Sequence, residues 1–430
     1  MGGLMQHKLA ATWQEEGLRA LAAQLPFTGA TQHWQDKALS FFIEDGFPTR
    51  KTEVWRYTDL TDLLQQDFVL NKYQGALDLS PFEIAESNRL VIVNGHVNFD
   101  LSTCDDDLSI LPLDILLETA DETLLRELKL DLDSQYFAGL NSALLNQGAY
   151  IKIKPNQCVQ KPLHILHVHH DNGPPPMQNL RFYIDVDKNA EVQIIEEHVG
   201  LSDAVYMNNI VTQINLNFDA RLRYYKLQRD SARAYHMATT VISLSAESQL
   251  HYNVFTTGAC LSREDLHVRH YERGAEAHLL GLFQANDKQQ MAHHTRVDHF
   301  KGGCTTHQHY KGIVDDRAHA AFDGQIIIHP GAQKSSTHQT NHNLLLSDQA
   351  EIDTKPSLEI YVDDVTASHG ATVGELSDKA LFYLRSRGIS EDDARALLIA
   401  AFADAIFDEL PRNKITDYIK EASFGGTSDD

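Results

Sequence analysis

Histidine is the residue type in this sequence with the clearest capacity for chemistry. The chain contains 23 histidines, and they are densest in the stretch AHHTRVDHFKGGCTTHQHYKG. The possible metal ligands in that stretch are His293, His294, His299, Cys304, His307 and His309. Because alternate residues of a strand share a face, His307 and His309 can present two imidazoles to one metal ion, with Cys304 nearby. No carboxylate stands at a fixed ligand spacing, so we favour a solvated strand face as the explanation of these residues.

A second pair, His167 and His169 in HILHVHH, raises the question of a cupin-type mononuclear iron site. That pattern requires a glutamate shortly after the pair, whereas Gly173 and three prolines follow here. The sequence also has no GxxxxGK[ST], no strand-linked GxGxxG and no GxSxG. We therefore expect neither intrinsic nucleotide chemistry nor a hydrolase with a nucleophile elbow.

The cysteines and the net charge exclude further classes. Cys104, Cys158, Cys260 and Cys304 form no CxxC pair, which excludes a zinc ribbon, a thioredoxin site and a local cysteine-rich cluster-binding run. A net charge of −23 argues against a nucleic-acid surface or an anionic-membrane surface. The first residues are polar and include two glutamates where a signal peptide needs an apolar run, and the apolar run 394–406 is too short to span a bilayer. We expect a soluble, cytoplasmic protein.

The middle of the chain alternates with period 2 and contains a repeat. A polar-small-polar-apolar pattern places its small residue at positions 190, 220, 248, 275, 318 and 350, with steps of 30, 28, 27, 43 and 32. After each small residue, every second side chain tends to be apolar, as in Ile352, Thr354, Pro356, Leu358 and Ile360. Stacked strands of this kind predict a β-solenoid, with an ordinary β-sandwich as the alternative. We expect most histidines on its surface, so that mild acid changes the net charge.

Helical patterns flank this region. The predicted organisation is a mostly helical region with a short strand pair over 1–148, a β-helix core over 149–365 and a helical domain over 366–430. Asn94-Gly95 is a hairpin signal within RLVIVNGHVNFD, and 113–132 and 134–147 have helical periodicity. Near the carboxyl end, Ser377 and Ser390 are predicted helix caps and Gly388 a helix stop.

Several longer motifs carry a resemblance to a known family. The pieces NLLLS, TKPSLEIYVDDV, SHGATVG and FYLRSRGI follow one another between residues 343 and 389. FDGQIIIHPGAQK lies upstream of them, and PTRKTEVWRYTDL lies near the amino end. Together they resemble the SUF iron–sulfur cluster assembly family, and its SufD branch more than its SufB branch. The resemblance runs from about Phe47 to Leu410, which is most of the chain.

The resemblance implies a fold and a set of partners. The fold is mainly β, a right-handed parallel β-helix core with helical domains at both ends. Members of the SufD branch pair with SufB, bind the ATPase SufC through the carboxyl-terminal helical region, and form homodimers in isolation. An iron–sulfur cluster would be held transiently and shared with SufB, and ATP would be handled only by SufC.

The resemblance also implies site residues. His369 matches the histidine of the family's SHGAT motif, which is proposed to serve cluster assembly at the SufB interface, and imidazole can replace thiolate on iron. Many members have cysteine two positions earlier, where this chain has Ala367. Arg385, Arg387 and Gly388 are the candidate SufC-facing residues, although helix-end chemistry explains their types as well. Trp55, Arg56 and Tyr57 match a family motif without a chemical role that we can assign.

The leading hypothesis is therefore a non-catalytic scaffold for iron–sulfur cluster assembly. One alternative is a β-solenoid carbohydrate lyase or hydrolase, for which carboxylates are plentiful although none is distinguished by its spacing. The other alternative is a homodimeric metal-binding protein that uses the 293–309 histidines.

Overall fold

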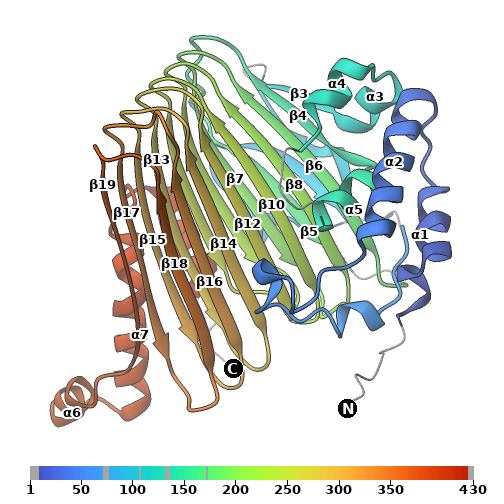
Figure 1. Ribbon diagram of the computed structural model, residues 1–430. Coiled ribbons are helices and arrows are strands. Elements are labelled where there is room, and N and C mark those ends of the chain that lie inside the picture. The colour runs from blue at the N-terminus through green and yellow to red at the C-terminus, as the bar shows by residue number, and fades with distance from the viewer. Residues whose placement is uncertain (1–8, 71–76, 106–107, 131–135, 171–172, 425–430) are drawn as a thin grey trace.

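A computed structural model describes residues 9–70, 77–105, 108–130, 136–170 and 173–424 (Figure 1). Strands β4 to β19 alternate between two sheets, and each pairs in parallel with the strand two places along the chain. Two strands make one coil, so this is the predicted parallel β-solenoid, with about eight coils. One sheet contains β5 (Leu163–His169), β7 (Glu191–Gly200), β9 (Arg221–Arg229), β11 (Gln249–Thr256), β13 (Glu276–Ala285), β15 (Thr305–Val314), β17 (Ser336–Leu345) and β19 (Thr366–Glu375). The other contains β4 (Gln147–Ile153), β6 (Met177–Val186), β8 (Met207–Leu216), β10 (Tyr235–Leu244), β12 (Leu261–His270), β14 (Gln290–His299), β16 (His319–Ile328) and β18 (Glu351–Ile360).

The sequence repeat marks the turns between the two sheets. The small residues at 190, 220, 248 and 275 precede β7, β9, β11 and β13, whereas those at 318 and 350 precede β16 and β18 of the other sheet. The irregular spacing of 43 residues, between positions 275 and 318, therefore reflects a change from one sheet to the other. The next member of the first series is Cys304, a small buried residue that aligns with Ala275. Asn189, Asp219 and Glu247 have positive φ, and this left-handed conformation is what the turn requires.

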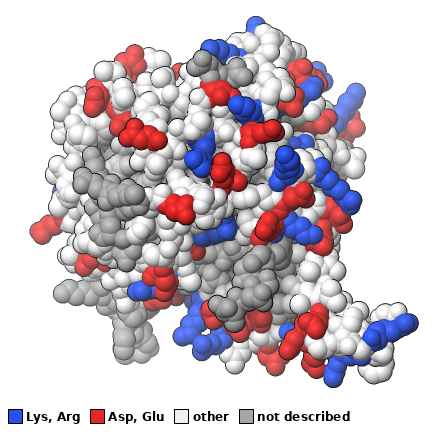
Figure 2. All heavy atoms as spheres, turned by 180° about the vertical axis from the view of Figure 1, so that it is seen from behind, with Lys and Arg blue, Asp and Glu red and all other residues white. Residues whose placement is uncertain are grey.

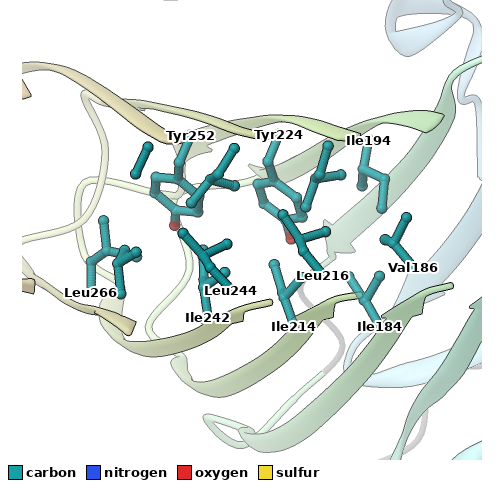
Figure 3. Packing of buried hydrophobic residues seen from close by; sticks show 14 of the residues in the cluster. Ile184, Val186, Ile194, Ile214, Leu216, Tyr224, Ile242, Leu244, Tyr252 and Leu266 are labelled. Atoms are coloured by element: carbon teal, nitrogen blue, oxygen red, sulfur yellow. The ribbon is translucent and has the colours of Figure 1, made fainter. Parts of the chain in front are cut away.

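The space between the two sheets is filled by columns of like side chains. Ile184, Ile214 and Ile242 are in register on β6, β8 and β10, and all three are fully buried (Figure 3). Tyr224 and Tyr252 face them from β9 and β11, with stacked rings 5.4 Å apart (Figure 3). Parallel strands in constant register repeat the same contact from coil to coil, which makes one continuous core.

At the amino end of the solenoid, each sheet finishes in an antiparallel strand. β1 (Asn88–Val93) runs parallel to β5, and β2 (His96–Thr103) folds back on β1 through Asn94 and Gly95, both with positive φ. This confirms the predicted hairpin. In the other sheet, β3 (Ser109–Pro112) pairs antiparallel with β4.

Helices cover the outer faces of both sheets (Figure 1). On the nine-stranded sheet, α5 (Tyr136–Leu144) contacts β6 and β8, and α2 (Gly29–Asp45) packs on α5. The other amino-terminal helices are α1 (Glu15–Ala22), α3 (Leu113–Glu118) and α4 (Glu122–Glu127), with short 3-10 turns at Ala11–Trp13, Glu53–Trp55, Leu63–Gln65 and Ser80–Phe82. The predicted amino-terminal segment and the predicted helical stretches 113–132 and 134–147 lie partly outside the described residues.

The carboxyl-terminal helices are α6 (Asp378–Ser386), α7 (Glu391–Phe407) and α8 (Lys414–Phe424). Side chains of α7 and α8 pack on the outer face of the ten-stranded sheet in one apolar cluster. Ser377 and Ser390 accept hydrogen bonds from the first turns of α6 and α7, as predicted. Among the described helices, none has the length and hydropathy that crossing a membrane requires.

The strands extend beyond the predicted boundary at 365/366. The segment that was predicted to begin the helical domain forms β19, which pairs with β17 along its whole length. The apolar residues at 365, 367 and 373 alternate with small and polar ones, which is a strand pattern. His369 consequently lies within the last coil of the solenoid.

Candidate functional site

The last coil is the open end of the solenoid. β19 and β18 are the terminal strands of their sheets, so each has a parallel neighbour on one side only. Most side chains of β19 are exposed. The backbone N–H of Thr366 donates to the Ser335 carbonyl at 3.1 Å, so by alternation the N–H groups of Ala367, His369, Ala371 and Val373 face the free edge. An edge with unpaired backbone groups is a template for pairing with another chain.

His369 lies on β19 opposite Gln339 of β17. Its neighbour Ser368 points to the outer face, where its hydroxyl lies 2.7 Å from Nδ1 of His338. By alternation, His369 lies on the side of Gln339, which is fully buried and donates to Gln308 at 3.0 Å. Among the described residues, none forms a hydrogen bond or ion pair with the exposed His369 side chain. The imidazole is therefore available at the mouth of the solenoid.

Ala367 occupies the position where many family members have cysteine. Its side chain is half-buried and packs against the core together with Leu358 and Val365. A methyl group there supplies packing but no ligand atom. Within the described part of the chain, two groups of His, Cys and carboxylate side chains are close enough to hold a metal ion, and neither includes His369. An iron site at this end would need ligands from a second protein.

Arg385, Arg387 and Gly388 lie at the end of α6, which has no buried residue. Arg385 forms an exposed ion pair with Glu391 at 3.1 Å, and the Arg387 guanidinium lies 5.2 Å from the centre of the Tyr383 ring. Gly388 has φ +91° and ends the helix, so its backbone conformation fully accounts for its type. Phe382 is 75% exposed, more than any other large apolar side chain among the described residues.

This part of the chain projects from the body of the molecule (Figure 1). Seen from behind, acidic and basic groups alternate over the projecting segment and are mixed across the rest of that face (Figure 2). The segment therefore offers aromatic side chains within a surface of both charge signs, which is typical of a protein-binding surface.

The predicted histidine cluster does not form one site. His307 and His309 share a face of β15, as predicted, but Cys304 points into the core between the sheets. His293 is also buried between the sheets, where its ring stacks on Phe283. His294 lies on the outer face of the nine-stranded sheet, where Arg263 donates to its Nε2 at 3.0 Å. Because side chains alternate along a strand, histidines that are close in the sequence are divided between the core and the outer faces of the sheets.

His307 and His309 contact a carboxylate that the sequence spacing did not reveal. Glu409, just beyond α7, lies 2.5 Å from Nδ1 of His309 and 3.7 Å from Nε2 of His307. The two imidazoles stabilise the carboxylate form of Glu409 and lower its pKa to about 2. Lys311 on the same strand donates to the Phe402 carbonyl of α7 at 2.8 Å. These contacts attach the carboxyl-terminal helices to the sheet.

Sequence reasoning missed a network of buried charged groups in the middle coils. Lys226 on β9 donates to Glu264 on β12 at 2.8 Å. His236 lies 2.9 Å from Asp230 and 3.2 Å from Glu264. Burial disfavours the carboxylate form of Glu264, but Lys226 and His236 outweigh it and lower its pKa to about 2. Burial would likewise lower the pKa of His236, yet its hydrogen bonds to Asp230 and Glu264 raise it.

The period-2 alternation of side chains along the strands contained a signal for this buried network. On β7 the inward positions are Val192, Ile194, Glu196 and His198, so the period-2 rule places a glutamate and a histidine inside. His198 Nε2 lies 2.8 Å from Glu196, and Tyr224 also donates to that carboxylate. The predicted pair His167 and His169 is buried as well, and a glutamate does approach His167, at 4.0 Å, but it comes from the next coil.

The expectation that most histidines lie on the surface is wrong for a large group. At least eight of the described histidines are buried. Burial lowers the pKa of His293 and of His299 to about 4, so these rings stay neutral in mild acid. They contribute to the core rather than to a titrating surface.

A cleft of about 460 Å³ on the outer face of the nine-stranded sheet gives the Trp55 motif a structural role. The buried Trp55 ring lies 3.8 Å from the guanidinium of Arg263, which also binds Asp265 at 2.8 Å. At the rim, Glu53 pairs with Lys355 at 2.8 Å. The Glu53–Lys355 pair attaches the loop to the sheet, whereas Asp265 is paired with Arg263 on its own strand.

Comparison with known proteins agrees with this architecture. A family model described as "SUF system FeS cluster assembly, SufBD core domain" matches residues 167–402, and one described as "SufBD protein N-terminal region" matches 27–88. The chain is 34% identical to an iron–sulfur cluster assembly SufBD family protein of Synechocystis, over 85% of this chain and 84% of that protein. It is 31% identical to the iron–sulfur cluster assembly protein SufD of Escherichia coli, over 92% of this chain and 93% of that protein. A chloroplastic protein of Arabidopsis thaliana, ABCI7, is 27% identical over 90% of this chain and 84% of that protein.

Proposed function

The chain belongs to the SufBD family of iron–sulfur cluster assembly proteins, and from this premise we propose that it is a cytoplasmic, non-catalytic scaffold that pairs with SufB through its last coil. The observation that carries the proposal is the open edge of β19 with the unpartnered His369 on it. At the amino end the two sheets finish in the antiparallel strands β2 and β3, whereas this end leaves a parallel ladder position and an imidazole for another chain. When SufB is absent, a second copy of this chain can occupy the same edge, giving a homodimer.

The nascent cluster is the cargo of this interface rather than a resident cofactor. His369 would supply one nitrogen ligand and SufB the remaining ligands, because the described residues around His369 provide no second one. With Ala367 in place of cysteine, this chain contributes no thiolate at that position. The cluster is therefore transient and shared between the two proteins.

The projecting helix α6 is the proposed docking site for SufC, the subunit that would bind and hydrolyse ATP. Arg385 and Arg387 supply charge, Gly388 sets the direction of the chain, and the exposed Phe382 supplies apolar area. Burying one such side chain at an interface is worth about 2–3 kcal/mol. The proposal includes no contact with nucleic acid or membrane.

Co-expression with SufB and SufC tests both surfaces. We expect the three proteins to co-purify with iron and sulfide, and a chain that remains alone would refute the proposal. His369→Ala should leave the complex intact and lower the iron and sulfide content, whereas His338→Ala, an exposed histidine of the preceding coil, should not. Phe382→Ala should release SufC and retain SufB. If His369→Ala assembles clusters as the unmodified chain does, the assigned role of His369 is wrong.

A further inference from the structure

The core between the sheets holds a group of metal-ligating side chains that the proposed interfaces do not use. His270 and His299 are adjacent in the pairing of β12 with β14, and Cys304 lies just before β15. One ligand atom from each of these three residues lies within 4.8 Å of the others. All three side chains are fully buried. Their packing thus joins three strands from two successive coils.

The hydrogen bonds of the two imidazoles are incomplete. Their rings stack with centres 4.2 Å apart. Nε2 of His270 and Nε2 of His299 both contact the Thr306 hydroxyl, at 3.1 and 2.9 Å, whereas Nδ1 of each ring has no partner. If the hydroxyl oxygen accepts an N–H from both rings, two Nδ1 lone pairs remain buried without a donor. Unsatisfied buried polar atoms are destabilising, so a ligand for them would stabilise the fold.

Packing does not explain why the third residue is cysteine. The equivalent turn positions in neighbouring coils are Ala275, Ser248 and Ser335, so a smaller side chain fits this column. The Cys304 thiol donates to the Glu272 carbonyl at 3.2 Å, and a metal ion would displace that proton on binding. Two imidazoles and one thiolate form a ligand set suited to a soft cation.

We propose that His270, His299 and Cys304 bind a thiophilic metal ion, with Zn²⁺ as the best match, and that Thr306 fixes the ring tautomers. Each Nδ1 would ligate the ion while Nε2–H donates to Thr306, which is the usual second contact of a ligating histidine. The sequence had associated Cys304 with His307 and His309, but these lie on the outer face, and the inner partners are His270 and His299.

The other buried group, His167, Glu196 and His198, is a weaker candidate for a metal. Glu196 already lies at hydrogen-bonding distance from His198 and accepts from Tyr224. The ammonium of Lys226 is close enough to lower the pKa of Glu196 and would repel a cation. The site at Cys304 has neither feature.

The test uses the isolated full chain, with Cys104→Ser and Cys158→Ser as the background to remove the two exposed thiols. After treatment with a chelator, Co²⁺ is added as a spectroscopic probe, and Zn²⁺ is then titrated in competition. We expect one equivalent of Co²⁺ with a thiolate charge-transfer band and displacement by Zn²⁺, whereas Mg²⁺ has no effect. Cys304→Ala should abolish the band, and Thr306→Val should weaken Zn²⁺ binding about 10- to 100-fold. The matched control Cys260→Ala should bind as the background does.

A folded background chain without a tetrahedral Co²⁺ spectrum, or an unchanged spectrum in Cys304→Ala, would overturn the proposal. Circular dichroism establishes whether each variant folds. If Cys304→Ala does not fold, Thr306→Val decides, because Zn²⁺ affinity equal to that of the background contradicts the assigned geometry. Neither SufB nor SufC is present in this experiment, so its outcome is independent of the proposed scaffold function.

Discussion

A middle coil and the last coil of this solenoid have the same backbone register but opposite surroundings. Lys226 on β9 and Lys355 on β18 show the difference, since each forms an ion pair at 2.8 Å. The Lys226 side chain is 1% exposed and its partner Glu264 is 6% exposed, whereas Lys355 and its partner Glu53 are 47% and 81% exposed. Equal distances therefore describe two different interactions, because burial removes the solvent that would screen the charges.

The same contrast applies to hydrogen bonding and to histidines. In the middle coils, the buried carboxylates are paired with side chains of this chain, as for Asp230 with His236 and Tyr206. In the last coil, backbone groups of β19 and the imidazole of His369 are left exposed. We conclude that the middle coils provide the stability of this protein, and the proposed pairing with SufB would depend on the end coil.

Replacing Lys226 should produce the largest effect. Lys226→Met leaves Glu264 and Glu196 buried without their ammonium group, and breaking a buried ion pair in this way typically costs about 3–5 kcal/mol. Lys355→Met, the matched change in the exposed pair, should cost about 0–1 kcal/mol. Urea unfolding of both variants measures the difference. Equal losses in the two variants would show that the contrast between the coils has no energetic basis.

Mild acid should destabilise the folded protein through its buried histidines, by somewhat less than the replacement of Lys226 does. His293 has a folded pKa of about 4 against an ordinary value of 6.5, so between these values only the unfolded chain takes up the proton. Its contribution is complete above pH 6.5, falls as the pH decreases, and the total loss is about 3 kcal/mol by pH 4. His293→Gln should flatten the unfolding free energy over this window. His338→Gln, at an exposed position, should leave the pH profile unchanged.

The buried carboxylates also make the protein less stable as the pH falls, but in a lower pH range. Glu264 has a folded pKa of about 2 against an ordinary 4.5, so its stabilisation is complete above pH 4.5 and is lost as the pH falls toward 2. A loss of stability confined to this lower window, with none between pH 6.5 and 4, would contradict the assignment of the buried histidines.

Much of the fold could be predicted from the sequence because a solenoid repeats local information. The small turn residues at 190, 220, 248 and 275 and the alternation after them reflect contacts between adjacent coils. The Asn94-Gly95 hairpin and the Ser377 and Ser390 caps are also local. Cys304 was missed as a member of the turn repeat because it matches the alanines of that repeat in size but not in residue type.

The sites were harder to predict because their residues meet across coils or domains. Glu409 reaches His309 from 100 positions away, and Lys226 meets Glu264 from a strand in the opposite sheet. No sequence spacing encodes such contacts. His369 was found through family motifs, and its exposure could be known only once β19 was seen to be the last strand.

The smallest effect on stability is expected at the free edge itself. Ala371 is exposed, and its N–H faces away from β17, so Ala371→Pro removes no ladder hydrogen bond of this chain. The free energy of unfolding should change by no more than about 0.5 kcal/mol. The same change removes a donor from the edge and places a ring against any added strand, so the affinity for SufB should fall about tenfold or more. Unfolding in urea and a SufB binding assay on the same preparation measure the two effects.

Thr340→Pro on β17 is the matched control, because its N–H faces β15 within the ladder. It should cost about 1–3 kcal/mol through an unsatisfied carbonyl, and it leaves the free edge of β19 as it is. Stability would then be lost at Thr340 and SufB affinity at Ala371. If Ala371→Pro binds SufB as tightly as the unmodified chain does, the partner does not add a strand at β19, and the open coil must be explained in another way.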